Sequence, residues 1–206
     1  MPLQLHYPFD TSGELALWNT TESVDELIAL AQPSAEEMDL LMSFPLEKRR
    51  KEWLTTRLLR NHLRPGVEIS YNENGKPFLP HEQLSISHSG HLAGMCCHPQ
   101  FAGLDIEKPS DKIVRVSFRF SHPSEIAKAP AHEPLLSRYL TTLWCAKEAI
   151  FKCFGVHVHF SKDIILRDFS DDDETIVADY KGIHGEKTFT LRRIMIDGMW
   201  VVHVVH

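Results

Sequence analysis

Two carboxylates stand two positions apart in the short apolar segment GLDIE, at Asp105 and Glu107. If this segment is a β-strand, both side chains project from one face and Ile106 projects from the other. Two like charges at this spacing repel each other unless a cation lies between them or one of them stays protonated. Their oxygens suit Mg²⁺ or Mn²⁺, which combine carboxylates with the phosphate oxygens of a substrate. The pair alone also fits a solvated strand end, so its interpretation depends on the rest of the chain.

A third carboxylate lies in LWCAKEAIFK, residues 143–152, where three charges stand among large apolar side chains. The apolar spacing predicts a helix with Trp144, Glu148 and Lys152 on one stripe. An exposed Glu148–Lys152 ion pair would contribute only roughly a few tenths of a kcal/mol. The large aromatic on the same stripe instead favours a helix that forms one wall of a cleft. Lys147 beside Glu148, Lys152 one turn on and a nearby metal together predict that this carboxylate is ionised at neutral pH.

The segment SISHSG, residues 85–90, sets small side chains around His88. Ser87, Ser89 and the glycine would let backbone N–H groups and an imidazole approach a phosphate closely. A Ser-His nucleophile is disfavoured, because neighbours in a strand point to opposite faces. Upstream, Lys76 lies in the turn NENGKP, which fits either a plain turn or a phosphate contact.

The charge of the chain is unevenly placed. The formal net charge is −6, which argues against general nucleic-acid binding, yet residues 48–64 hold seven Lys/Arg and one Glu. If this segment is helical, Leu54 and Leu58 turn toward a core, and a solvated face or a phosphate-binding face remains for the basic residues. The side chains predicted to share that face are Arg49, Trp53, Arg57, Arg60 and Arg64.

The order of predicted elements indicates an α+β fold. The first third reads as helical, with a Ser23–Glu26 capping box and Pro45 before the basic helix. Short β-like runs then fill residues 67–107, and a helical stretch follows from about 111 to 154, broken by prolines. The tail returns to strands, with a tight hairpin at Asp197-Gly198. We expect two similar α/β halves, residues 1–108 and 109–206.

Composition points to a reducing compartment. The four cysteines lie in apolar stretches without a CxxC or zinc-ligand spacing, so we expect reduced core residues and a cytoplasmic protein. The N-terminus has no basic, apolar leader, and the terminal WVVHVVH is too short to cross a bilayer, so we expect no membrane contact. The HVH at residues 157–159 has no third metal ligand nearby in the sequence and is predicted to be a loop or strand start.

Taken together, the motifs resemble a known family. GKPFLP, LSISHSG, GLDIE and WCAKEAIFK, in this order and at these separations, are similar to the 4′-phosphopantetheinyl transferases, specifically the longer two-halved type. RRKEWLTTRLLR and VRVSFRFSHPSE resemble its basic helix and the segment before its long helix, so the resemblance spans roughly residues 45–170. It implies halves related by a pseudo-two-fold axis, with coenzyme A in the cleft between them, and a monomer, because one chain supplies both halves.

The resemblance also implies the chemistry. Coenzyme A would donate its phosphopantetheine arm to a serine of an acyl, peptidyl or siderophore carrier protein, releasing adenosine 3′,5′-bisphosphate. Asp105, Glu107 and Glu148 would hold Mg²⁺, with Mn²⁺ as a possible substitute. Glu148 would take the serine proton, directly or through a water, and Lys152 would stabilise the leaving phosphate. The implied coenzyme A contacts are Arg50, Arg57, Lys76, Ser87, His88, Lys147 and Lys152.

A further implied contact is SFRF, residues 117–120, a cation between aromatics that suits an acidic helix of the carrier protein. Two other functions stay open. A metal-dependent phosphodiesterase or nuclease would use the three carboxylates without SISHSG and GKP. A non-catalytic module that binds coenzyme A or a carrier protein would not need the full acidic set and Lys152.

Overall fold

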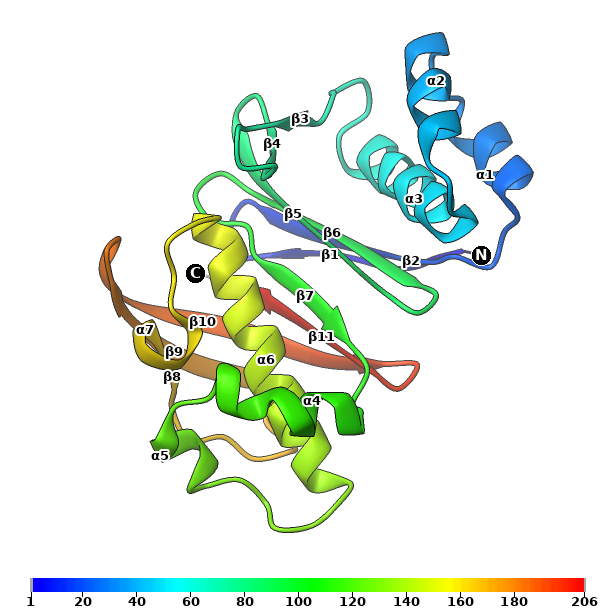
Figure 1. Cartoon of the computed structure of the whole chain (residues 1–206). Helices are drawn as coiled ribbons and strands as arrows, with labels where there is room; N and C mark the ends of the chain where they lie inside the picture. The colour runs from blue at the N-terminus through cyan, green and yellow to red at the C-terminus, as the bar shows by residue number, and fades with distance from the viewer. Residues whose placement is uncertain (1, 206) are drawn as a thin grey trace.

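The chain folds around two antiparallel sheets that meet side by side (Figure 1). The computed structural model describes residues 2–205. The first sheet has the order β1-β2-β6-β5-β4-β3 and the second the order β7-β11-β10-β9-β8. A long helix packs on each sheet, α3 on the first and α6 on the second. The predicted α+β class is confirmed.

The N-terminal part begins with a hairpin rather than a helix, so the prediction that the first third is helical was wrong in its first twenty residues. The strands are β1 (Leu3–Phe9) and β2 (Gly13–Asn19), which pair antiparallel. In β1 the side chains alternate between exposed and half-buried, which is the period of a strand with one wet face. Gly13 follows the turn and contacts the Phe9 ring, which leaves no room for a Cβ.

Three helices follow this hairpin. They are α1 (Val24–Ala31), α2 (Ala35–Ser43) and the basic α3 (Glu47–Leu63). The predicted Ser23–Glu26 capping box is present, and Ser34 with Glu37 forms a second one. Leu59 and Leu63 pack α3 on the sheet, while Trp53, Leu54 and Leu58 pack against α1 and α2. The basic helix therefore lies between the sheet and a pair of covering helices.

The first sheet is completed by short strands, as predicted for residues 67–107. These are β3 (Ser70–Tyr71), β4 (Pro77–Leu79), β5 (Glu82–Ser89) and β6 (Leu92–His98). The strand of the GLDIE motif, β7 (Leu104–Glu107), pairs with β11 and so belongs to the second sheet. The division of the chain after residue 108 stays a prediction.

The predicted broken helical stretch contains α4 (Asp111–Val116), the 3₁₀ turn η1 (Ser117–Arg119), α5 (Pro123–Ile126) and α6 (Leu135–Phe154). The short α7 (Phe160–Asp163) leads into β8 (Ile164–Leu166), β9 (Thr175–Gly182), β10 (Gly185–Ile196) and β11 (Met199–Val204). Asp197 and Gly198 both have positive φ, as the predicted hairpin turn requires.

The two sheets share an apolar core. Leu15 and Leu17 of β2 pack there with Leu104 and Ile106 of β7 and with Val201 of β11. The four cysteines are buried and free, which confirms their predicted place in the core. No helix in residues 2–205 is both long enough and apolar enough to cross a membrane. The shared core holds the acidic strand β7 between the first sheet and α6.

Candidate active site

The acidic strand β7 is held at its free edge by serine side chains of β5. The backbone N–H groups of Leu104 and Ile106 donate to Ser85 Oγ (2.9 Å) and Ser87 Oγ (3.1 Å). Ser87 Oγ in turn donates to Asp105 Oδ1 at 2.9 Å. The alternating serines of SISHSG therefore supply partners that a neighbouring strand would otherwise supply. One hydroxyl, that of Ser87, also orients a carboxylate.

Lys152 of α6 reaches the same carboxylate from the other side. Its ammonium donates to Asp105 Oδ1 (2.8 Å), to the Leu104 carbonyl (2.8 Å) and to Ser87 Oγ (3.2 Å). The three acceptors match the three N–H donors of an ammonium group. Asp105 Oδ2, by contrast, is buried without a hydrogen-bond partner in the described part of the chain. Buried carboxylate oxygens normally have a partner, so this atom is one place where a ligand fits.

Glu148 lies on α6 one turn before Lys152, among the other carboxylates. Burial raises the pKa of Glu148 to about 7, and Asp105 and Glu107 add to the rise while Lys152 opposes it. The prediction was that two lysines and a nearby metal hold this carboxylate ionised, and its part on the two lysines was wrong. Lys147 is engaged elsewhere, so Lys152 alone opposes burial and two like charges. Burial and Asp105 also raise the pKa of Glu107.

The donor chemistry of these carboxylates suits a divalent cation. Asp105 offers an unpartnered oxygen, and burial together with repulsion from Asp105 raises the pKa of Glu107 and of Glu148, an arrangement that a cation would relieve. Among residues 2–205, however, no group of three or more His, Cys, Asp or Glu side chains is placed to hold one metal ion. The oxygen atoms of these residues fit a divalent cation in their chemistry, and the cation itself stays a proposal.

A hollow of about 380 Å³ lies between the basic helix and the sheet. His88 lines it, and its imidazole is 3.1 Å from Thr56 Oγ1 of α3. Burial lowers the pKa of His88 to about 4, which leaves the ring neutral at pH 7. Lys48 and Lys51 also line this hollow, each in an ion pair with a glutamate of the same wall, Glu52 at 3.7 Å and Glu47 at 3.5 Å. An anionic ligand would compete with these two exposed pairs for the lysines. The hollow can accept an anionic group beside a neutral hydrogen-bonding imidazole.

A second hollow, of about 210 Å³, lies on the Lys152 side of β5. Lys76, Ile86, Phe151 and Lys152 are among its lining residues. The Lys76 ammonium donates to the Cys153 carbonyl at 2.6 Å and to Gln83 Oε1 at 3.1 Å, and burial lowers its pKa. Because Lys152 also contacts Asp105, this hollow opens beside the carboxylates.

The sequence comparisons agree with this geometry. Residues 102–193 match the family model of the 4′-phosphopantetheinyl transferase superfamily. This part of the chain is similar to that superfamily, and the match covers less than half of the chain. A 4′-phosphopantetheinyl transferase of Bacillus subtilis is 30% identical to the chain over 111 residues. The alignment covers 52% of this chain and 50% of that protein, so the chain spans about half the length of this curated relative.

The matched segment 102–193 contains Asp105, Glu107, Glu148 and Lys152 and brings them to one place, where β7 faces α6. It confirms the family resemblance drawn from the motifs. Lys76, Ser87 and His88 lie outside the matched segment but adjoin the same place, since β5 carries two of them and Lys76 shares a hollow with Lys152.

The prediction of which face of the basic helix binds phosphate needs correction. Arg57 is buried, its guanidinium lies 3.7 Å from the Trp53 ring centre, and its Nε is 3.4 Å from Glu37 Oε1. The helices α1 and α2 cover this face, so Arg57 lines neither of the two hollows. Arg50 donates to the Phe44 carbonyl at 2.8 Å and does not line either hollow.

The face of α3 that does meet the hollow carries Lys48, Lys51 and Glu52, at i, i+3 and i+4. Sequence reasoning missed these two lysines as site residues because Trp53 and the arginines make the opposite face look functional. The signal that could have separated the faces is Thr55 and Thr56, small residues that let α3 approach the sheet.

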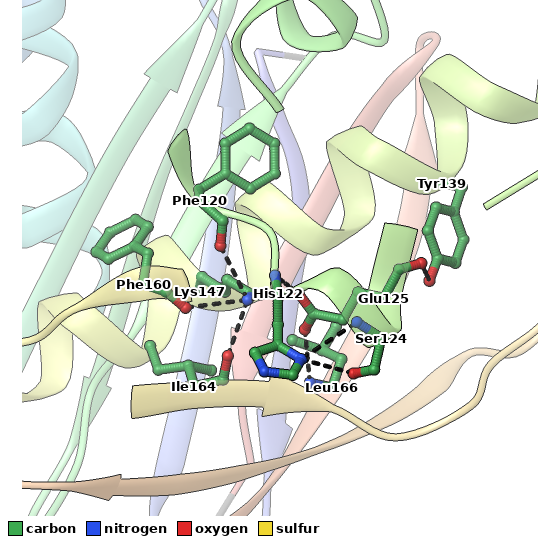
Figure 2. A network of polar contacts seen from close by, with 9 residues as sticks. All are labelled: Phe120, His122, Ser124, Glu125, Tyr139, Lys147, Phe160, Ile164 and Leu166. Carbon is green, nitrogen blue, oxygen red and sulfur yellow. Dashed lines mark hydrogen bonds and ion pairs between the residues drawn. The ribbon is translucent and has the colours of Figure 1, made fainter. Parts of the chain in front are cut away.

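The role implied for Lys147 also needs correction. Its side chain is fully buried, and Figure 2 shows its ammonium among backbone carbonyls and beside Glu125. It lies away from both hollows, so it is not placed to bind coenzyme A as the resemblance implied. Neighbouring positions on a helix point about 100° apart, which separates Lys147 from Glu148.

Proposed function

We propose that this chain transfers the 4′-phosphopantetheine group of coenzyme A to a serine of an apo acyl or peptidyl carrier protein, releasing adenosine 3′,5′-bisphosphate. The observation that carries the proposal is the meeting of Asp105, on β7, with Lys152, on α6, next to Glu148 and beside the hollow that Lys152 and Lys76 line. The superfamily match covers both elements of this meeting point.

In the proposed step, the serine Oγ attacks the phosphorus that carries the pantetheine. A new P–O bond forms while the bond from this phosphorus to the bridging oxygen breaks, and that oxygen leaves with the electron pair on the bisphosphate. Glu148 takes the serine proton, directly or through a water. A carboxylate with a pKa of about 7 is a better proton acceptor near neutral pH than an ordinary glutamate. Lys152 supplies positive charge for the leaving phosphate.

Asp105, Glu107 and Glu148 are the residues that would hold Mg²⁺ or Mn²⁺. When bound, the cation offsets negative charge on the pyrophosphate oxygens. The support is the unpartnered Asp105 Oδ2 and the mutual repulsion of the three carboxylates. The remaining phosphate contacts are assigned to the cations of the hollows, Lys48 and Lys51 in the first and Lys76 in the second.

The carrier protein is proposed to dock at residues 117–119. Phe118 is 72% exposed, and the Arg119 guanidinium lies 5.5 Å from its ring centre, a pairing suited to an acidic amphipathic helix. The expected second aromatic, Phe120, is buried instead against Trp144. The proposed docking contact is therefore formed by one aromatic side chain, Phe118, and one cation, Arg119.

We further propose that the chain acts as a monomer in the cytoplasm. It supplies both sheets of the site, and its four cysteines are free. An overall charge of −6 argues against nucleic acid as a partner and leaves the local cations for anionic ligands.

The test is the mass of an apo acyl carrier protein and of an apo peptidyl carrier protein after incubation with the enzyme, coenzyme A and Mg²⁺. We expect at least one carrier to gain one phosphopantetheine group, with one bisphosphate released per carrier. Nucleotide release without any gain on a carrier would identify a phosphodiesterase instead. Binding of coenzyme A without either product would identify a non-catalytic module.

A further inference from the structure

The ammonium of Lys147 fills a cation site built entirely from oxygens of the protein. Its Nζ lies 2.7 Å from Glu125 Oε2 and within 3.0 Å of three backbone carbonyl oxygens, those of Phe120, Phe160 and Ile164 (Figure 2). An ammonium group has three N–H donors, so four oxygens share them. All three donors of Lys147 are therefore used, and the site offers one oxygen more than they need.

Glu125 closes the network on the other side. Its Oε2 also accepts from the backbone N–H of His122 at 2.7 Å, and its Oε1 accepts from the N–H of Leu166 at 2.9 Å. The side chains of Glu125 and Lys147 are 2% and 0% exposed. Burying a charge pair costs desolvation free energy that only full hydrogen bonding offsets, and this pair has it.

The network joins segments that are far apart in the sequence. One lysine of α6 connects the segment of η1 and α5 with the segment of α7 and β8. Its partners are Phe120 just after η1, Glu125 of α5, and the first residues of α7 and β8, Phe160 and Ile164. Aromatic contacts follow the same path, since the Trp144 ring lies 5.1 Å from that of Phe120 and 5.6 Å from that of Phe160.

The exposed residues Phe118 and Arg119 directly precede the anchored Phe120. The Phe118 side chain is 72% exposed, and its one ring contact in the described residues is Arg119 itself. On the N-terminal side these two side chains are fixed by the hydrogen bonds of Ser117, and on the C-terminal side by the Phe120 carbonyl and by Glu125. Both fixing points on the C-terminal side bind the ammonium of Lys147.

We propose that Lys147 is a positioning residue that holds residues 117–126 as the docking face for the carrier protein, without touching coenzyme A. The inference rests on the proposed function for the identity of the partner. Lys147 and Glu148 then act in sequence on one helix, the first by placing the partner and the second by accepting its proton.

The test compares Lys147→Met with Arg193→Met. Arg193 is a matched buried cation in the same half, since it bonds Thr142 of α6 and the carbonyls of Ser170 and Asp171, but it does not contact residues 117–126. In Lys147→Met we expect the KM for an apo acyl carrier protein to rise about tenfold or more, with the Kd for coenzyme A within about threefold of wild type. In Arg193→Met both constants should stay within about threefold.

Hydrogen exchange gives a readout that does not need activity. The amides of His122 and Leu166 should exchange at least about tenfold faster in Lys147→Met and within about threefold of wild type in Arg193→Met. Unchanged exchange at both amides, or equal acceleration in the two variants, would overturn the proposal. If wild-type protein modifies no carrier, the proposed function fails, and exchange alone decides the positioning role.

Should Lys147→Met not fold, Glu125→Gln serves as the second variant. It keeps the size of the side chain and one acceptor oxygen, but a single amide oxygen cannot replace the two carboxylate oxygens that accept from His122, Leu166 and Lys147. The same acceleration at His122 and Leu166 is expected. Wild-type exchange in this variant would also overturn the proposal.

Discussion

Two lysines five positions apart on α6 form ion pairs of opposite character. Lys147 and Glu125 are 0% and 2% exposed, and every charged atom of the pair has a partner. Lys152 and Asp105 are 25% and 8% exposed, and Asp105 Oδ2 has no partner in the described residues. We call the first pair closed, because each of its charged atoms has a partner, and the second open, because Asp105 Oδ2 has none in the described residues.

This difference separates a structural pair from a chemical one. A closed pair has no atom left for a ligand, so it contributes by fixing the chain around it. An open pair keeps an unpartnered oxygen beside Glu148, whose pKa is raised to about 7, and such an arrangement costs stability in the absence of a ligand. Sites that bind charged ligands often carry this cost.

The largest expected effect is that of Glu148→Gln on transfer. Gln keeps the shape and one oxygen but cannot accept the serine proton, so we expect single-turnover transfer to fall ~10²-fold or more, about 2.7 kcal/mol in activation free energy. The Kd for coenzyme A should stay within about tenfold of wild type, because the lysines of the hollows are unchanged. A transfer rate close to that of wild type would show that Glu148 is not the base.

Serines 85 and 87 offer a matched pair for the next effect. Each accepts from a backbone N–H of β7, so Ser85→Ala and Ser87→Ala should each lower the free energy of unfolding by about 1–3 kcal/mol. Ser87 alone also contacts Asp105 and Lys152, so we expect only Ser87→Ala to slow transfer. Urea unfolding and a single-turnover assay check the two halves of the prediction. Equal loss of transfer in both variants would assign Ser87 to the fold alone.

The smallest effect concerns the pH dependence of stability. The folded pKa of Glu148, about 7, lies above its ordinary value of 4.5, so between these pH values the folded protein binds more protons than the unfolded chain. The stability that this group contributes is present at low pH and is lost as pH rises through 7. Glu148→Gln lacks this loss, so its advantage over wild type in unfolding free energy should grow from near zero at about pH 4.5 to roughly 1–2 kcal/mol above pH 7.

The measurement is urea unfolding of both proteins across this range, with a chelator present so that no cation shifts the pKa of Glu148. Parallel curves for wild type and variant would contradict the raised pKa. An advantage of the variant that grows toward low pH would contradict its sign.

Local patterns predicted much of the fold. The capping box at Ser23, the strand alternation of GLDIE and the hairpin at Asp197-Gly198 depend on neighbours in the sequence, and all three are present. The β1–β2 hairpin was missed although LQLHYPF alternates apolar and other residues as a strand does. Its turn lacks the Asn-Gly or Asp-Gly pair that would have marked a hairpin.

The missed site features depend on long-range contacts. The face of α3 that meets the hollow is decided by the covering helices α1 and α2, which bury Arg57 against Trp53 and Glu37. Glu125 stands 22 positions before Lys147, and no periodicity links the two. Ser87 was expected to contact coenzyme A, and the bonds of Ser85 and Ser87 to β7 become visible only when both sheets are in place.

The most direct test of the central claim compares Lys147→Met with Lys152→Met in two assays, urea unfolding and single-turnover transfer at saturating coenzyme A and carrier protein. We predict that the effects cross. Lys147→Met leaves Glu125 buried and unpaired and should lower the free energy of unfolding by about 3–5 kcal/mol, with a small change in the rate at saturation. Lys152→Met should lower the unfolding free energy by only about 1 kcal/mol and slow transfer ~10²-fold. Losses of stability and of transfer in the same proportion in both variants would contradict the division of α6 into a closed pair and an open one.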